Sequence, residues 1–193
     1  MKKTKLILVT TFLLLTTVLF SQDINRLVEN NGFKKIKLNS NIYDYVTDGY
    51  YDFVKNTPKN NPDYHIREVF DYVYATGDLK KIVDITISSI YVKTINDTIY
   101  EIKVYMPSNT EIYDMLNMAF GKPTREITNR YASDYGIGSG DAYYWEPKNS
   151  SISLNFFFGE GIYCSITYTN ETLKESGVLQ KKKEQKKKAQ NGF

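Results

Sequence analysis

Cysteine and histidine, which often serve as nucleophiles, bases and metal ligands, each occur only once in this chain of 193 residues. The lone Cys164 excludes an internal disulfide, so the fold must depend on its hydrophobic core. Cys164 alternates with apolar residues in an expected strand, which predicts a buried thiol of low reactivity. His65 lies in an expected loop without the partners of a Ser-His-Asp or Cys-His site. We predict no catalytic residue, no metal site and no cofactor.

A basic surface is also lacking over most of the chain, although the net charge is +3. The basic residues gather at the two ends, with three lysines in the first five residues and seven from Lys174 onward. Residues 23–173 hold 15 basic and 20 acidic side chains, a net charge of −5. A region of this sign lacks the electrostatic footprint of a nucleic-acid-binding protein. We therefore expect no nucleic-acid partner.

The chain has no apolar run long enough to span a bilayer, which needs about 20 residues. Its longest run, residues 6–20, follows three lysines and ends beside the small residue Ser21. These are the three parts of a secretory signal. We expect residues 1–22 to be removed near Ser21 or Gln22 and the protein to be periplasmic or secreted. No cysteine follows the run, so a lipoprotein is not expected.

Tyrosine is abundant, with 17 residues. Because tyrosine favours strands, this load predicts a protein rich in sheet. Alternating apolar and polar residues predict strands over residues 33–38, 69–75, 83–92, 100–106, 142–146, 151–158 and 162–169. Residues 40–54 and 110–120 have helical periodicity. The second of these follows a Ser-x-x-Glu capping box, Ser108 to Glu111, and ends at Gly121.

We predict an α+β fold with an antiparallel sheet of about six to eight strands and one or two helices packed on one face. The element order is compatible with two β-α-β-β halves. Residues 23–173 would form one domain, and residues 124–141 would be irregular. Residues 174–193 form a lysine-rich tail without an apolar stripe, expected as a frayed helix or disordered segment.

Two hairpins allow the strand pairing to be predicted. A turn at residues 95–97 sets Ile90 opposite Ile102, and the broken alternation at Ser88 and Ser89 predicts a β-bulge there. The connection at residues 159–161 pairs the last two strands. Their apolar side chains would then share one face, and their hydroxyl and amide side chains would share the other. This contrast predicts a sheet that is covered on one side only.

The uncovered face holds the best candidate site for binding. Tyr144, Phe157 and Tyr163 should lie on it, next to a glycine-rich loop, residues 131–141, that contains Asp134, Tyr135 and Asp141. Clustered aromatic side chains on a surface are typical of recognition sites. We interpret the chain as an exported, non-enzymatic binding module of the bacterial envelope that recognises a protein or a glycan.

Two other functions stay open. The chain could be a small hydrolase that uses Asp141 or Glu146 in an acidic pocket with two carboxyls about 5–10 Å apart, or a domain that blocks the cleft of another enzyme. The tail could also contact anionic lipid headgroups weakly. The lysines that would do so are Lys181, Lys182, Lys183, Lys186, Lys187 and Lys188.

Over residues 108–158, a helix is followed by Gly121-Lys122-Pro123 and then by strands that carry Trp145. This order resembles the small envelope scaffolds of the outer-membrane assembly lipoprotein type and the β-lactamase-inhibitor-like fold. The resemblance concerns element order and carries over no functional residue. The missing lipoprotein cysteine is a departure from the first family.

Overall fold

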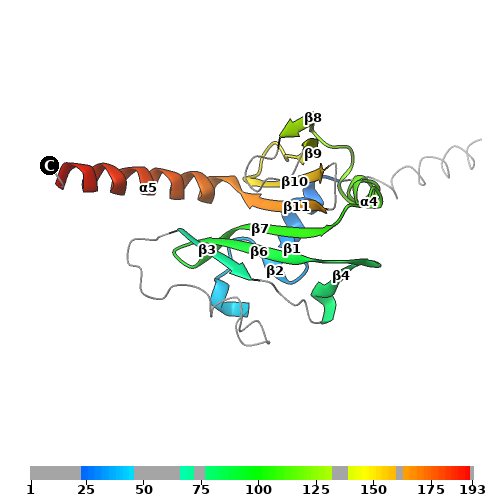
Figure 1. The fold of residues 1–193 in the computed structure, drawn as a ribbon, viewed down its shortest axis with the longest axis horizontal. Coiled ribbons are helices and arrows are strands. Elements are labelled where there is room, and N and C mark those ends of the chain that lie inside the picture. The colour runs from blue at the N-terminus through cyan, green and yellow to red at the C-terminus, as the bar shows by residue number, and fades with distance from the viewer. Residues whose placement is uncertain (1–22, 46–65, 72–76, 132–138, 160–162, 192–193) are drawn as a thin grey trace, which may run out of the picture.

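The structure is a computed structural model that describes residues 23–45, 66–71, 77–131, 139–159 and 163–191 (Figure 1). The expected leader, His65 and two residues of the candidate loop, Asp134 and Tyr135, lie outside the described residues. Most of the helix expected over residues 40–54 lies outside them as well. Its described beginning is a short 3-10 helix, η1 (Ile42–Tyr45), whose Ile42 is buried.

A seven-stranded antiparallel sheet forms the centre of the fold, which confirms the α+β class. Its strands, in spatial order, are β3 (Ile66–Asp71), β6 (Ser89–Ile95), β7 (Thr98–Pro107), β11 (Tyr163–Asn170), β10 (Ile152–Gly159), β9 (Ser139–Trp145) and β8 (Arg125–Tyr131). Two antiparallel meanders, β3-β6-β7 and β8-β9-β10-β11, meet where β7 pairs with β11. The edge strand β8 corrects the expectation that residues 124–141 are irregular.

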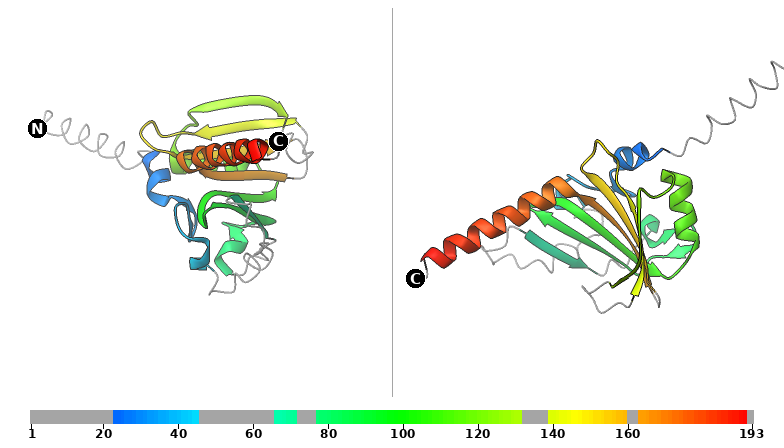
Figure 2. Two further views of the ribbon diagram at one scale, coloured as in Figure 1. Left: turned by 90° about the vertical axis from the view of Figure 1, so that its left-hand side faces the viewer. Right: turned by 90° about the horizontal axis from the view of Figure 1, so that it is seen from above.

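Short elements cover one face of this sheet, which we call the inner face (Figure 2). The helices α2 (Asn25–Asn30) and α4 (Glu111–Phe120) contact each other, and α2 also contacts β10. The core also takes in buried side chains from the hairpin of β1 (Gly32–Phe33) and β2 (Ile36–Lys37) and from η2 (Gly77–Lys80). A small hairpin, β4 (Lys81–Ile82) with β5 (Ile85–Thr86), precedes β6. The inner face is therefore the buried one.

The expected strand over residues 33–38 is instead the tight β1–β2 hairpin. Phe33 pairs with Ile36, so the chain reverses through Lys34 and Lys35. Lys34 has a φ of 51°, a left-handed conformation that a continuous strand does not contain. Phe33, Ile36 and Leu38 are all buried, because the hairpin brings them to the same core. The apolar residues are buried as predicted, but they lie in a hairpin with a turn at Lys34 and Lys35 instead of in one continuous strand.

The helix α4 confirms the expectation for residues 110–120, including its end at Gly121. Ile112, Leu116 and Phe120 are buried, as their helical spacing predicts. The cap differs from the expected Ser108–Glu111 box, because the Asn109 side-chain oxygen accepts a hydrogen bond from the Glu111 amide at 2.8 Å. Gly121 has a φ of 83°, which a residue with a Cβ atom rarely adopts.

The β6–β7 hairpin turns near the expected place, but with a two-residue turn instead of the predicted turn over residues 95–97 and with a different register. Asn96 and Asp97 both have positive φ, as in the two-residue turn that suits twisted hairpins. Ile95 therefore pairs with Thr98, and Ile90 lies opposite Val104 instead of Ile102. The register shifts between Lys93 and Thr94, not at Ser88 and Ser89. The turn is one residue shorter than predicted, and the bulge beside it restores the pairing of apolar with apolar residues. Apolar alternation alone therefore could not distinguish the predicted register from the observed one.

In the β10–β11 hairpin the predicted register is also wrong by two residues, since Phe156 pairs with Ile166 and Leu154 with Tyr168. A shift of two leaves every side chain on its predicted face. Leu154, Phe156, Cys164 and Ile166 are accordingly buried on the inner face. Trp145 is also fully buried there, as expected, and its indole nitrogen donates to the Gly121 carbonyl at 2.7 Å.

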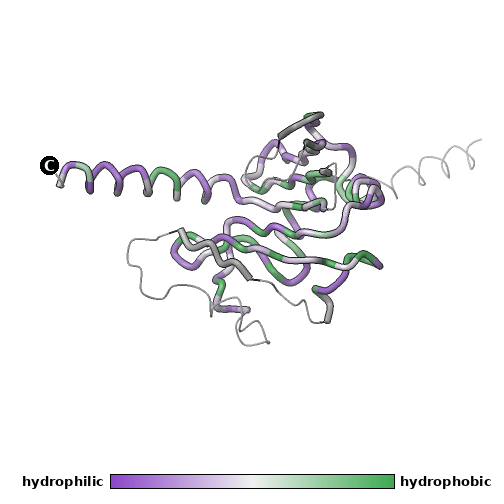
Figure 3. Tube along the Cα trace, in the orientation of Figure 1, coloured by the Kyte–Doolittle hydropathy of each residue, from purple (hydrophilic) through white to green (hydrophobic). Residues whose placement is uncertain are grey.

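The helix α5 (Glu171–Asn191) follows β11 directly and projects away from the sheet (Figures 1 and 2). The Asn170 side-chain oxygen caps it by accepting a hydrogen bond from the Leu173 amide at 3.1 Å. The helix contacts β6, β7 and β11. Hydrophilic residues dominate its length, whereas the strands alternate in hydropathy (Figure 3). The expected lysine-rich tail is thus part of this projecting helix.

Candidate functional site

The opposite side of the sheet, which we call the outer face, carries polar and aromatic side chains. Strand register aligns six of them in one row across the sheet, from β6 to β8. This central row consists of Tyr91, Lys103, Thr167, Asn155, Tyr144 and Arg125. Arg125 is exposed and the other five are partly exposed. With strands about 4.8 Å apart, the row extends over roughly 24 Å.

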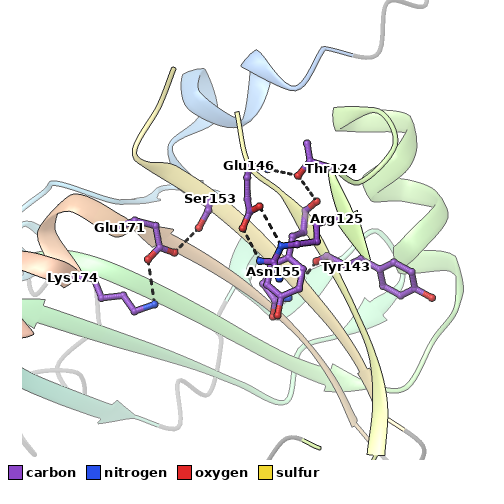
Figure 4. A network of polar contacts seen from close by, with 9 residues as sticks. Thr124, Arg125, Tyr143, Glu146, Ser153, Asn155, Glu171 and Lys174 are labelled. Carbon is purple, nitrogen blue, oxygen red and sulfur yellow. Dashed lines mark hydrogen bonds and ion pairs between the residues drawn. The ribbon is translucent and has the colours of Figure 1, made fainter. Parts of the chain in front are cut away.

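At the β8 end of the row, Arg125 is held by two neighbours (Figure 4). Its guanidinium carbon lies 3.6 Å from the centroid of the Tyr144 ring. One guanidinium nitrogen lies 2.8 Å from a carboxylate oxygen of Glu146, and Nε lies 3.5 Å from the other oxygen. The hydrogen bond to Glu146 raises the pKa of Arg125. Stacking and two-point pairing fix the planar group in one orientation.

The backbone beneath this pair is held by Thr124, which precedes β8. The Thr124 hydroxyl donates to the Tyr144 carbonyl at 3.0 Å and accepts from the Glu146 amide at 3.1 Å. On the adjacent strand, the Asn155 amide donates to the Tyr143 carbonyl at 3.3 Å. These contacts connect β8, β9 and β10 through their polar groups (Figure 4). The β8 end is consequently an ordered surface.

The first turn of α5 joins the same face. The Ser153 hydroxyl donates to a carboxylate oxygen of Glu171 at 2.9 Å, and Lys174 Nζ lies 3.3 Å from the other oxygen (Figure 4). Ser153 lies two residues before Asn155 on β10, so both point to the outer face. The helix therefore leaves the domain from the outer side of the sheet.

At the β6–β7 end of the central row, two tyrosines and a lysine lie together on the outer face. The rings of Tyr91 and Tyr105 meet edge to face with centroids 5.2 Å apart. Lys103 Nζ lies 4.9 Å from the Tyr105 centroid, within the range of a cation–π interaction. Lys93 and Glu101 form an ion pair of 3.1 Å beside them. Each end of the outer face thus combines an aromatic ring with a cation.

The structure places Tyr144, Phe157 and Tyr163 on one diagonal of the outer face. Tyr144 and Tyr163 each lie two residues along from a direct neighbour of Phe157, namely Ala142 and Ser165. Phe157 is only 8 % exposed, whereas Tyr163 is 45 % exposed. Gly140 explains part of this burial, because a Cβ atom built there would lie 2.8 Å from the Phe157 ring. Phe157 supports the surface, and the two tyrosines remain accessible.

The two carboxylates named for a possible hydrolase, Asp141 and Glu146, are not brought together. The two residues lie five positions apart in extended chain, so they point to opposite faces and are separated by about 16 Å. Paired carboxylates in glycosidases lie about 5–10 Å apart on the same cleft. Glu146 also forms the ion pair with Arg125. Asp141 and Glu146 therefore do not form a carboxylate pair with each other.

Outside the outer face, the described residues offer few groups that could bind a metal ion or react. Cys164 is buried, burial raises the pKa of its thiol, and its sulfur lies 3.4 Å from the Pro107 carbonyl oxygen. Within the described residues, no group of three or more Asp, Glu, His or Cys side chains could hold a metal ion. Nor is any described helix both long and apolar enough to cross a membrane. The outer face remains the candidate site.

Sequence reasoning identified this face but selected only one residue of its central row, Tyr144, as a candidate. Arg125 was missed because the polar alternation of β8 gives no strong strand signal. Lys103, Asn155 and Thr167 could have been found, since each alternates with a buried neighbour on a predicted strand. The row itself could not be assembled from the sequence, because the predicted registers of both hairpins differ from the observed ones by two residues.

Comparisons with protein-family models, with curated proteins and with solved structures find no significant match to this chain. The likeness over residues 108–158 therefore remains one of element order. Any function must be argued from the outer face itself.

Proposed function

We propose that this protein is an exported binding module without catalytic chemistry, and that it recognises an extended polar ligand across the central row. The ligand would be a protein segment or an envelope glycan. The observation that carries the proposal is the row itself, six aligned and accessible polar or aromatic side chains over roughly 24 Å. The export signal expected in residues 1–22 supports the envelope as the location.

The chemistry of the row suits a ligand rich in hydroxyl or carbonyl groups. Lys103 can donate hydrogen bonds, whereas Asn155 and Thr167 can both donate and accept them. Tyr91 and Tyr144 combine an apolar ring with a polar hydroxyl group, a combination enriched in binding sites. Because Arg125 is oriented by Tyr144 and Glu146 before any ligand arrives, little conformational entropy would be lost on binding.

The test replaces the middle of the row without disturbing the core. A triple variant, Lys103→Ser, Asn155→Ser and Tyr144→Ser, is compared with the original chain for binding to purified cell-wall glycan and to envelope proteins. Phe157 is left intact because it is buried. A decrease of at least about tenfold in affinity is expected, since removing each polar or aromatic side chain from a binding site typically costs about 1 kcal/mol or more.

The matched control carries the same three changes at exposed positions away from the row, Lys148→Ser, Asn149→Ser and Tyr43→Ser. This control should bind as the original chain does. Equal binding by the row variant and the original chain, or an equal decrease in the control, would refute the site. Binding to glycan alone or to protein alone identifies the ligand class.

A further inference from the structure

The outer half of α5 carries a row of lysines on one side of the helix. Lys182, Lys183, Lys186 and Lys187 are spaced at i, i+1, i+4 and i+5, so they share one side, which we call the lysine face. Leu179 lies on the same side, three and four residues before the first two lysines. In most surface helices, positions with this spacing are apolar and pack on a core. Here all four are exposed lysines.

The described residues supply no ion-pair partner to the lysine face. In the part of the chain that the structure describes, none of the four lysines forms an ion pair. The segment from Lys174 onward holds seven lysines and two glutamates, a net charge of +5, whereas residues 23–173 carry −5. The chain is therefore strongly polarised, with its positive charge on the helix that projects from the sheet (Figure 1).

The length of α5 separates the two charges. At 1.5 Å per residue, Lys182 lies roughly 17 Å and Lys187 roughly 24 Å along the helix from Glu171. Electrostatic screening in physiological salt acts over about 8 Å. An anionic surface in contact with the lysine face would hence meet little repulsion from the acidic domain. The helix acts as a spacer as well as a carrier of charge.

We propose that the lysine face docks on the anionic phospholipid headgroups of a bilayer. Four lysines on one side of a helix can meet a plane of phosphates together, and each lysine near such a surface contributes about fivefold to binding. The helix has no apolar stripe, so it lies on the surface without deep insertion. Leu179, 58 % exposed, is the one large apolar side chain on that side.

Two other possible partners of the lysine face, a second copy of the chain and a nucleic acid, fit it less well. A second copy of the chain would have to bring its acidic domain against the four lysines, whereas the flat plane of a bilayer can meet all four together. A nucleic acid extending beyond the helix would meet the acidic domain, and the expected export signal places the protein away from nucleic acid. A membrane surface requires contact with the helix alone.

The test uses the chain from residue 23 onward, which contains every described element, and co-sedimentation with vesicles. Binding is expected to vesicles with about 30 % phosphatidylglycerol but not to pure phosphatidylcholine, and to fall steeply as salt rises from about 0.05 to 0.3 M. The variant K182Q/K183Q/K186Q/K187Q should bind the anionic vesicles at least about tenfold more weakly. Glutamine keeps helix propensity, which circular dichroism checks.

The matched control, K80Q/K81Q/K122Q/K148Q, removes the same charge from exposed lysines of the domain and should bind as the original chain does. An equal decrease in both variants would mean that only net charge matters and would overturn the proposal. Absence of binding to anionic vesicles would also overturn it. So would tighter binding to duplex DNA in the same buffer, or self-association that the face variant abolishes.

Discussion

Asn170 joins the last strand to the projecting helix, and replacing it tests how α5 is attached. Its side-chain oxygen accepts from the Leu173 amide at 3.1 Å, and its side-chain nitrogen donates to Asn39 Oδ1 at 2.6 Å. Asn170 is only 6 % exposed. Loss of an N-cap costs about 1 kcal/mol, and loss of a net hydrogen bond costs about another 1 kcal/mol. Asn170→Ala should thus lower the free energy of unfolding by about 2 kcal/mol.

The measurement is urea unfolding followed by circular dichroism, with variants that separate the two contacts. Asn39→Ala removes the partner amide, at about 1 kcal/mol, and also places alanine at a φ of 67°, which costs about another 1 kcal/mol of backbone strain. Asn170→Ser keeps a cap oxygen but cannot reach Asn39, so it should cost about 1 kcal/mol. In a double-mutant cycle, Asn39→Ala and Asn170→Ala should show coupling of about 1 kcal/mol. Additive effects, or a cost below about 0.5 kcal/mol for Asn170→Ala, would refute this account.

Buried groups allow three further tests. Trp145→Phe should destabilise the fold by about 2–4 kcal/mol in urea unfolding, because it removes indole volume and leaves the Gly121 carbonyl unpaired; a decrease below about 1 kcal/mol would contradict it. Cys164 should react slowly with a thiol reagent at about pH 8 in the folded protein and rapidly in urea, since burial raises its pKa; equal rates would contradict this. Gly140→Ala should lower the melting temperature, because its Cβ would lie 2.3 Å from the Phe158 carbonyl oxygen; an unchanged melting temperature would show that the strands separate freely.

Side-chain alternation predicted the faces of the sheet but not its pairing. Leu154 and Ile166 are buried because period-two patterning assigns a face independently of register, and a shift of two residues leaves that assignment intact. Register depends on the turn, and Asn96 with Asp97 formed a two-residue turn with a bulge beside it. The local pattern carried no information on which of these registers would form.

The elements that were missed lack strong local patterns. Arg125 lies on an edge strand with few apolar residues, and it is held by Tyr144 and Glu146, which are about 20 positions away in sequence. Phe33 and Ile36 looked like one strand because their apolar pattern does not reveal a reversal at Lys34. The candidate face could be predicted from alternation, but the residues that complete it depend on long-range pairing.

The two proposals make a joint geometric claim because α5 leaves from the outer face. The contact of Ser153 with Glu171 fixes the helix start on the same side as the central row. If the lysine face lies on a bilayer, the central row is held within the roughly 31 Å length of α5 from the membrane contact. A ligand held there would be close to the membrane surface. Inserting one extra helical turn before Lys182 should preserve vesicle binding and binding to the row. Because the helix lies along the bilayer surface, a fluorescent label on Tyr43→Cys in a Cys164→Ser background should keep its distance from the bilayer after this insertion, and a clearly increased distance would show that the helix stands upright instead.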